Sequence, residues 1–302
     1  MTDLIQTAAL TKFYGRRRGL AGLDLDVHAG EVYGFLGPNG AGKTTTIRIL
    51  LDLIRPTSGL ATLFGQTPRR GGPTLRHRVG YLPGDFTVLG GQSGRGLLTH
   101  LAHLRGGIPD SRIDGLADRL ELDLSTRIDK LSKGNRQKLG VVQAFMHEPE
   151  LLILDEPTIG LDPIMQQRFL DLVTDARAAG QTVFMSSHVL SEVQQSADRV
   201  GIIRDGTLVA VEAVESLRRR AVRRVEVQFD EPVPVEAFSG LADLRDVEVD
   251  GRVLRCRLAG RADGLVKTAA RFGVASLTVQ EPDLEELFLE FYRGEEADHA
   301  AG

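Results

Sequence analysis

Residues 37–44 read Gly37-Pro38-Asn39-Gly40-Ala41-Gly42-Lys43-Thr44, which matches the phosphate-loop pattern G-x-x-x-x-G-K-[ST]. Glycine permits tight turns in which successive backbone N–H groups converge on phosphate oxygens, and a helix N-terminus adds partial positive charge. We expect all eight residues to bind nucleotide: Lys43 at the β- and γ-phosphates, and Thr44 also through Mg²⁺, with a further contact from Thr45. The alternative is a glycine-rich turn that binds nothing.

The residues on either side of this loop supply the context that the motif requires. Residues 32–36, Val-Tyr-Gly-Phe-Leu, form an apolar run typical of a buried strand. Residues 43–53 predict a helix, which residues 55–59, Arg-Pro-Thr-Ser-Gly, end with turn-forming side chains. A strand, a glycine-rich loop and a helix in this order favour phosphate binding over a plain turn.

A second apolar run, residues 151–154, ends in two adjacent carboxylates, Asp155 and Glu156. Its unbroken apolar character suits a parallel strand that is covered on both faces. We expect Asp155 to hold Mg²⁺ and its hydration shell, as the strand-end aspartate of phosphate-loop enzymes does. Glu156 is then free to act as the general base that activates water. The alternative is an exposed acidic pair that caps a strand.

The rest of the first two hundred residues alternates short apolar runs with longer amphipathic stretches. Residues 182–186 predict a third buried strand, and strands separated by helical patterns indicate an α/β domain with a mainly parallel sheet. Residues 86–145 differ, because a glycine-rich entry leads into helical spacing, which predicts a mostly helical insertion. We expect this domain to span residues 1–215.

A second, smaller domain is predicted for residues 222–294. An arginine-rich run at residues 218–224 precedes it, either a basic surface for lipid headgroups or a partner, or a solvated helix end leading to a linker. The pattern that follows is strand, helix, strand, strand, helix, strand, helix, which predicts an α+β unit of the βαββαβ kind. The last helix is expected at residues 282–292, and residues 295–302 predict a polar tail.

The amino-acid composition excludes several classes of protein. The chain has 302 residues, 42% of them hydrophobic, a formal charge of −4 and one cysteine, Cys256, and its pI is about 6.0. One cysteine excludes internal disulfides and cysteine-cluster metal sites, and the pI argues against a chain that is basic throughout for nucleic acid. Because no apolar run approaches about 18 residues and no secretory signal begins the chain, we expect a soluble, intracellular protein.

Two further motifs carry a family resemblance. Residues 131–138, Leu-Ser-Lys-Gly-Asn-Arg-Gln-Lys, precede an apolar helical stretch shortly before Asp155, and Ser187-His188 follows the third strand. Together with the phosphate loop and the acidic strand end, their order over residues 4–210 resembles the ATP-binding cassette (ABC) ATPase family. The resemblance implies an ABC ATPase domain with a helical subdomain, which works as a head-to-tail dimer with two ATP molecules at its interface.

The same resemblance assigns roles to five more residues. Tyr14 is similar to the aromatic residue that stacks on adenine, Ser132 and Gly134 to the signature residues that contact the γ-phosphate held by the other subunit. Asp162 is similar to the residue that couples the two halves, and His188 to the histidine that contacts γ-phosphate and orients water. Three of these residues have a plainer alternative: Tyr14 as a core or edge tyrosine, Asp162 as a helix-start aspartate and His188 as a structural histidine.

The chain departs from the family pattern at two places. The usual signature is Leu-Ser-Gly-Gly-Gln, whereas this chain has Lys133 and Asn135 within it, which modifies the expected γ-phosphate contact. The family also has a glutamine soon after the strand predicted at residues 79–83, where this chain has Gly84 and Asp85. Asp85 is either a substitute oxygen donor or a turn residue.

Residues 280–289, Gln-Glu-Pro-Asp-Leu-Glu-Glu-Leu-Phe-Leu, resemble the closing helix of the ABC-2 type, daunorubicin-exporter-like ATPases. The resemblance implies an ATP-hydrolysing subunit on the cytoplasmic face of the cell membrane, attached to a separate membrane-spanning permease, with no nucleic-acid partner. Two alternatives stay open: a soluble ABC ATPase that remodels nucleic acid or ribosomes, and a regulatory ATP-binding module with little turnover.

Overall fold

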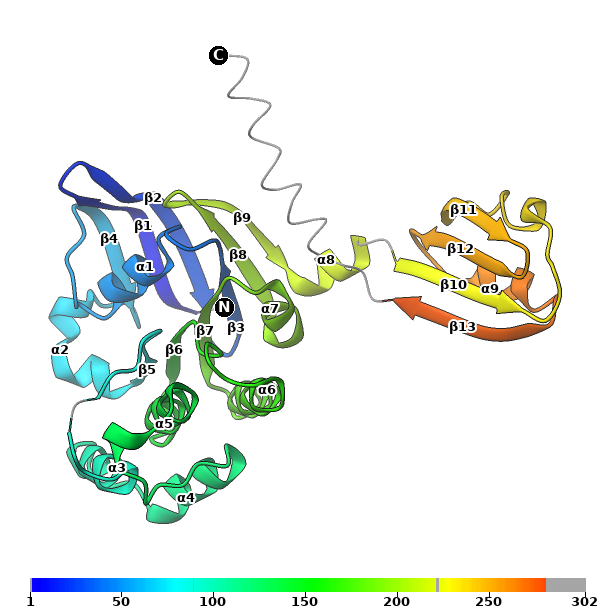
Figure 1. The fold of residues 1–302 in the computed structure, drawn as a ribbon. Coiled ribbons are helices and arrows are strands. Elements are labelled where there is room, and N and C mark those ends of the chain that lie inside the picture. Colours follow the sequence, from blue (N-terminus) through cyan, green and yellow to red (C-terminus); the bar gives the residue numbers. More distant parts are fainter. Residues whose placement is uncertain (1, 89, 221–222, 281–302) are drawn as a thin grey trace. The chain divides into compact units, whose positions relative to one another are not determined.

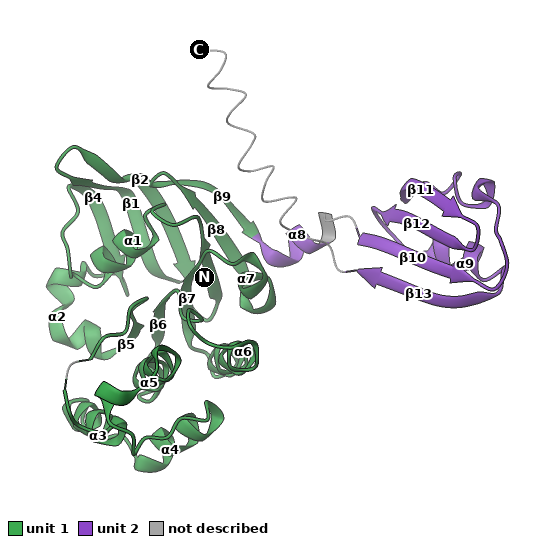
Figure 2. Cartoon of the chain, in the orientation of Figure 1, with its two compact units in different colours: residues 1–212 green, residues 213–302 purple. Residues whose placement is uncertain are grey.

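The computed structural model describes residues 2–88, 90–220 and 223–280 (Figure 1). The chain divides into two compact units, Met1–Glu212 and Ala213–Gly302 (Figure 2). The helix predicted at residues 282–292 and the predicted tail at 295–302 lie outside the described residues. No helix within the described residues is both long and apolar enough to cross a membrane.

The first unit is built on a mainly parallel sheet with the strand order β5-β6-β7-β3-β8-β9. The three strands predicted from apolar runs form its centre, at β3 (Val32–Leu36), β6 (Leu151–Asp155) and β7 (Thr182–Ser187). The other strands are β5 (Val79–Leu82), β8 (Arg199–Arg204) and β9 (Thr207–Ala213). Strand β7 pairs in parallel with β3 on one side and with β6 on the other. The carboxyl ends of the three strands therefore lie at one edge of the sheet.

Both faces of this sheet are buried, which explains the unbroken apolar runs. Leu151 and Ile153 point into one core cluster, and Leu152 and Leu154 point into the other. On one face lie α1 (Lys43–Leu50) and a second, antiparallel sheet. On the other lie α5 (Lys133–Phe145) and α6 (Pro163–Ala178) (Figure 1). The fold class predicted from sequence is therefore confirmed.

The antiparallel sheet was not predicted from the sequence. Its order is β2-β1-β4, from β1 (Asp3–Tyr14), β2 (Arg17–His28) and β4 (Ser58–Leu63). The register between β1 and β2 shifts at several points, and Ala9 takes a positive φ of 47°. Such bulges interrupt the strict alternation by which a strand is found in a sequence.

The remaining helices of the first unit lie in the predicted helical insertion and in two other connections between strands. The helical insertion contains α3 (Gly94–Leu104), α4 (Asp110–Arg119), a 3₁₀ turn (Ile128–Lys130) and α5. Two further helices are α2 (Pro68–His77) and α7 (Leu190–Ser196). The residues between 86 and 145 are thus mostly helical, as their spacing predicts.

The second unit begins with α8 (Val214–Arg220) and continues as an antiparallel sheet with the order β11-β12-β10-β13. Its elements are β10 (Arg223–Phe229), β11 (Leu244–Asp250), β12 (Val253–Leu258), α9 (Asp263–Ala269) and β13 (Val274–Gln280). The first connection holds only a 3₁₀ turn (Val235–Ala237) where a helix was predicted. Pro232 and Pro234 explain this difference, because proline interrupts backbone hydrogen bonding.

Candidate nucleotide-binding site

The phosphate loop connects the carboxyl end of β3 to the first residue of α1. Its conformation requires glycine at two positions. A Cβ on Gly37 would lie 2.3 Å from the Ile203 carbonyl oxygen. Gly42 has a φ of +115°, and its Cβ would lie 2.9 Å from the carbonyl oxygen of Gly19. The neighbouring backbone therefore fixes the shape of the loop before any ligand binds.

Lys43, the first residue of α1, holds the loop in place. Lys43 is buried, and its Nζ donates a hydrogen bond of 2.6 Å to the carbonyl oxygen of Gly37. A longer bond of 3.3 Å reaches the carbonyl oxygen of Pro38. The ammonium group thus lies against the backbone of the phosphate loop, bonded to two of its carbonyl oxygens.

The two carboxylates that end β6 have different surroundings. Asp155 is 2% exposed, and its Oδ1 accepts a hydrogen bond of 2.6 Å from the hydroxyl of Ser186 on β7. Glu156 takes a φ of +48°, which is strained for a residue with a side chain. Its backbone N–H donates to the hydroxyl of Ser186 at 3.0 Å. One serine therefore positions both acidic residues.

A chain of contacts joins three of the predicted residues from distant parts of the sequence. Lys43 Nζ lies 3.0 Å from Glu156 Oε1. The other carboxylate oxygen, Oε2, lies 2.6 Å from Nδ1 of His188. The structure thus brings together the predicted phosphate-binding lysine, the predicted general base and the predicted switch histidine at one edge of the sheet.

A pocket of about 420 Å³ opens above the phosphate loop. The side chains that line it include Tyr14, which is 46% exposed, so a core role for this residue is excluded. Its hydroxyl lies 3.5 Å from Thr45 Oγ1. Sequence reasoning missed the cations that share this lining: Arg17, Arg18 and Arg48. The run of arginines at residues 16–18 was a visible signal, since basic residues close to a phosphate loop favour anions.

The signature residues do not line this pocket. Ser132 caps α5, because its Oγ accepts a hydrogen bond of 3.2 Å from the Asn135 N–H. A Cβ on Gly134 would lie 2.7 Å from the carbonyl oxygen of Gly160. Asp162 caps α6 by accepting a bond of 3.0 Å from the Met165 N–H, so its helix-start role is observed directly.

Comparisons with known proteins agree with this geometry. A family model described as ABC transporter matches residues 20–159. The bacitracin transport ATP-binding protein of Bacillus licheniformis is 37% identical over 305 residues, which covers 97% of this chain and 99% of that protein. The chain belongs to the ABC transporter ATP-binding protein family.

Other members of the family support the same conclusion. A daunorubicin resistance ATP-binding protein of Streptomyces coeruleorubidus is 34% identical over 291 residues, 92% of each chain. A solved structure described as the ATP-binding subunit of an ABC transporter has a TM-score of 0.66 at 28% identity, covering 72% of this chain and 92% of its own. The names of the two relatives refer to antibiotics, which confirms the resemblance to the drug-exporter group.

The residues present in this ABC protein fit a magnesium nucleotide. Loop amides, Lys43 and the nearby arginines offer the donors and positive charge that a triphosphate needs. Thr44 and Asp155 provide hydroxyl and carboxylate oxygens, the ligand type that Mg²⁺ prefers. A Cβ on Gly84 would lie 3.6 Å from the Asp155 Cγ, so the segment that carries Asp85 passes beside these oxygens.

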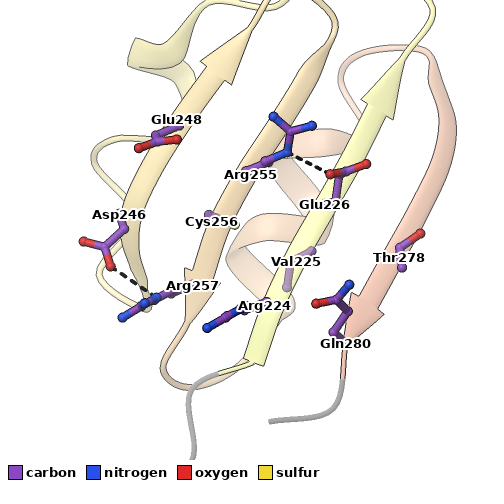
Figure 3. A pocket seen from close by; sticks show the side chains of 10 residues that line it. All are labelled: Arg224, Val225, Glu226, Asp246, Glu248, Arg255, Cys256, Arg257, Thr278 and Gln280. Carbon is purple, nitrogen blue, oxygen red and sulfur yellow. Dashed lines mark hydrogen bonds and ion pairs between the residues drawn. The ribbon is translucent and has the colours of Figure 1, made fainter. Parts of the chain in front are cut away.

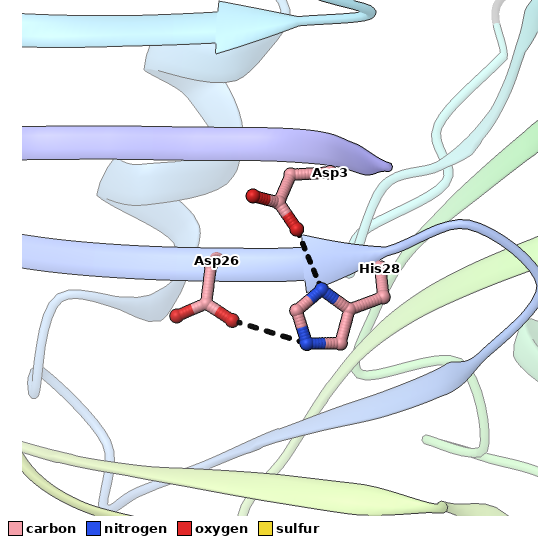
Figure 4. Close-up of side chains that lie close together, drawn as sticks. All are labelled: Asp3, Asp26 and His28. Carbon is pink, nitrogen blue, oxygen red and sulfur yellow. Dashed lines mark hydrogen bonds and ion pairs between the residues drawn. The ribbon is translucent and has the colours of Figure 1, made fainter. Parts of the chain in front are cut away.

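A cluster of titratable groups on the antiparallel sheet serves a different purpose (Figure 4). His28 Nδ1 lies 2.6 Å from an oxygen of Asp3, and its Nε2 lies 3.6 Å from an oxygen of Asp26. Asp26 also pairs with Arg199 of β8 at 3.0 Å. Since the ring nitrogens and carboxylates already face each other and a guanidinium group, we interpret the cluster as a link between β1, β2 and β8.

The open face of the sheet in the second unit carries a separate pocket of about 490 Å³ (Figure 3). Its charged side chains form pairs across neighbouring strands. Arg255 lies 2.9 Å from Glu226, and Arg257 lies 3.4 Å from Asp246. Residues of both signs alternate across this face, unlike the cationic lining of the nucleotide pocket.

Proposed function

We propose that this chain is the ATP-hydrolysing subunit of an exporter, and that two copies close on two ATP molecules to drive a separate membrane-spanning permease. The observation that carries the proposal is the contact chain from Lys43 through Glu156 to His188 beside the phosphate loop. The relatives named for bacitracin transport and daunorubicin resistance support the exporter assignment. The protein would then lie on the cytoplasmic face of the cell membrane.

ATP binding changes the partner of Lys43. In the described structure its ammonium group pairs with Glu156, and a bound triphosphate offers it β- and γ-phosphate oxygens instead. Tyr14, which lines the pocket, would stack on the adenine ring. Thr44 and Asp155 would hold Mg²⁺, which supplies positive charge to the phosphate oxygens.

Once Lys43 has turned to the phosphates, Glu156 is free to accept a proton from water. The water oxygen then bonds to the γ-phosphorus while the bond to the leaving ADP oxygen breaks. His188, at 2.6 Å, holds the carboxylate of Glu156 in orientation. Ser132 and Gly134 of a second copy would complete the site around the γ-phosphate. Loss of the γ-phosphate after hydrolysis would then let the two copies separate.

The proposal predicts a specific effect of Glu156→Gln. The amide retains the shape of the side chain but cannot accept the proton, so kcat should fall at least ~100-fold. ATP should still bind, because Lys43 and the loop amides are unchanged. Phosphate release and equilibrium binding of ATP measure the two properties separately.

Glu150→Gln is the matched control, since this exposed glutamate pairs with Arg78 at the opposite end of β6. Its kcat should match that of the unmodified protein. Near-normal hydrolysis by the Glu156→Gln variant would contradict the assigned role. Recovery of a membrane-spanning protein with the tagged chain supports the exporter, whereas recovery of ribosomes supports the remodelling alternative.

A further inference from the structure

Glu192 of α7 is a buried carboxylate that the mechanism above does not use. Glu192 is 7% exposed. Oε1 accepts a hydrogen bond from the Thr158 hydroxyl, and Oε2 accepts one of 2.7 Å from the Ser187 hydroxyl. Among the described residues it forms no ion pair. Burying a carboxylate that only hydroxyl groups stabilise costs free energy of folding. We therefore expect Glu192 to have a role other than packing.

The two hydroxyls belong to segments that adjoin the proposed reacting groups: Thr158 lies in the loop after β6, and Ser187 is the last residue of β7. Thr158 follows Glu156 by two residues, and Ser187 immediately precedes His188. Both are buried, at 4% and 0% exposure. One side chain therefore joins the loop after β6 to the carboxyl end of β7, close in sequence to both Glu156 and His188.

Helix α7 gives Glu192 a rigid base. Its next residue, Val193, packs against β3 at Gly34, where a Cβ would lie 2.3 Å from Val193 Cγ1. The absence of a side chain at Gly34 thus lets the helix approach the strand that leads into the phosphate loop. Glu192 is held at a fixed position relative to that loop.

We propose that Glu192 is a positioning residue for ATP hydrolysis. It holds Thr158 and Ser187 so that the Glu156 carboxylate and the His188 ring keep their relative position when Lys43 leaves Glu156 for the phosphates. The proposal rests on the proposed hydrolysis, and Glu192 itself touches neither nucleotide nor water.

The test compares Glu192→Ala with Glu192→Gln in the full chain. Alanine removes both acceptors, so kcat should fall at least ~10-fold, because small displacements of reacting groups carry large rate penalties. The affinity for ATP should change less than about 3-fold, since the phosphate loop does not depend on the two hydroxyls. Glutamine keeps one acceptor oxygen and offers an N–H to the other hydroxyl, so it should recover most of kcat.

Gln181→Ala is the matched control. Gln181 joins the same two strands at their opposite ends, where its Nε2 donates a bond of 2.5 Å to the Pro149 carbonyl oxygen. This variant should lower the melting temperature while leaving kcat unchanged. If Glu192→Ala does not fold, Thr158→Val removes one of the two hydrogen bonds and should also lower kcat without weakening ATP binding.

A second readout does not need ATP hydrolysis. The ring resonances of His188 in the nucleotide-free protein, assigned with a His188→Gln variant, should shift in Glu192→Ala and remain near their original positions in Gln181→Ala. Unchanged kcat and unchanged His188 resonances in Glu192→Ala would overturn the proposal. If the unmodified protein hydrolyses no ATP, the proposed function fails, and the His188 resonances alone decide whether Glu192 positions the ring.

Discussion

At the scale of the residue, the central feature is that Lys43 neutralises Glu156. The two side chains are 6% and 12% exposed and lie 3.0 Å apart. Removing one partner of such a buried pair leaves an uncompensated charge. In the proposed mechanism, a triphosphate gives Lys43 new anionic partners, and the same exchange releases Glu156 to act as the general base.

The glycines of the phosphate loop yield a prediction at this scale. Gly42→Ala combines an unfavourable φ of +115° with a Cβ that meets Leu20 at 2.7 Å. We expect a loss of roughly 1–3 kcal/mol in unfolding free energy and at least ~10-fold weaker ATP binding. Urea unfolding and ATP titration measure the two effects.

Gly180→Ala is the control, because it introduces backbone strain without a steric clash of the new Cβ. Gly180 has a φ of +85°, but a Cβ there meets no atom within 4 Å. This control should cost some stability and leave ATP affinity unchanged. Equal ATP affinity in the Gly42→Ala variant and the unmodified protein would count against the loop as the phosphate site.

The sequence predicted the reacting residues but not the residues that position them. Lys43 and Asp155 lie in patterns whose spacing carries their chemistry. Ser186 and Glu192 act through hydrogen bonds between segments that are distant in the chain, and no local pattern reveals those partners. Only the three-dimensional structure shows which of these distant segments lie next to each other.

At the scale of the element, the packing of α5 against β5 gives a pH-dependent prediction. His147 follows α5, and its Nε2 lies 3.3 Å from the Val79 carbonyl oxygen at the start of β5. Burial, with the nearby Arg105, lowers the pKa of His147 to about 4 from its usual 6.5. The unfolded chain therefore takes up a proton before the folded protein does as the pH falls.

Stability should decrease as the pH falls from about 6.5 towards 4, because only the unfolded state gains the proton in that range. His147→Gln removes the titrating group, so the variant should lose about 1 kcal/mol less than the unmodified protein between pH 7 and pH 5. Urea unfolding at the two pH values measures this, and equal losses in both proteins would refute it.

Elements differed in how well the sequence predicted them. The buried strands at residues 32–36 and 151–155 were found because each is apolar on both faces. The long strands β1 and β2 were missed, since bulges break their alternation and their outer side chains are polar. The helix expected before β11 failed for a local reason, the two prolines in its segment.

At the scale of the whole molecule, the signature residues of one chain lie outside the lining of its own nucleotide pocket. Ser132 and Gly134 do not line the pocket that contains Lys43. In the proposed function, the signature residues of one copy face the nucleotide pocket of another copy. ATP then contributes to the stability of the pair, because only the closed arrangement gives the γ-phosphate both sets of contacts.

Sedimentation velocity of the Glu156→Gln variant with ATP and Mg²⁺ tests this claim most directly. Ser132→Asp retains the N-cap of α5 but places a negative charge opposite the γ-phosphate, whereas Ser93→Asp makes the same change at the N-cap of α3. The account predicts an ATP-dependent dimer that Ser132→Asp abolishes and Ser93→Asp preserves. A monomer at saturating ATP, or a dimer that Ser132→Asp leaves intact, would contradict it.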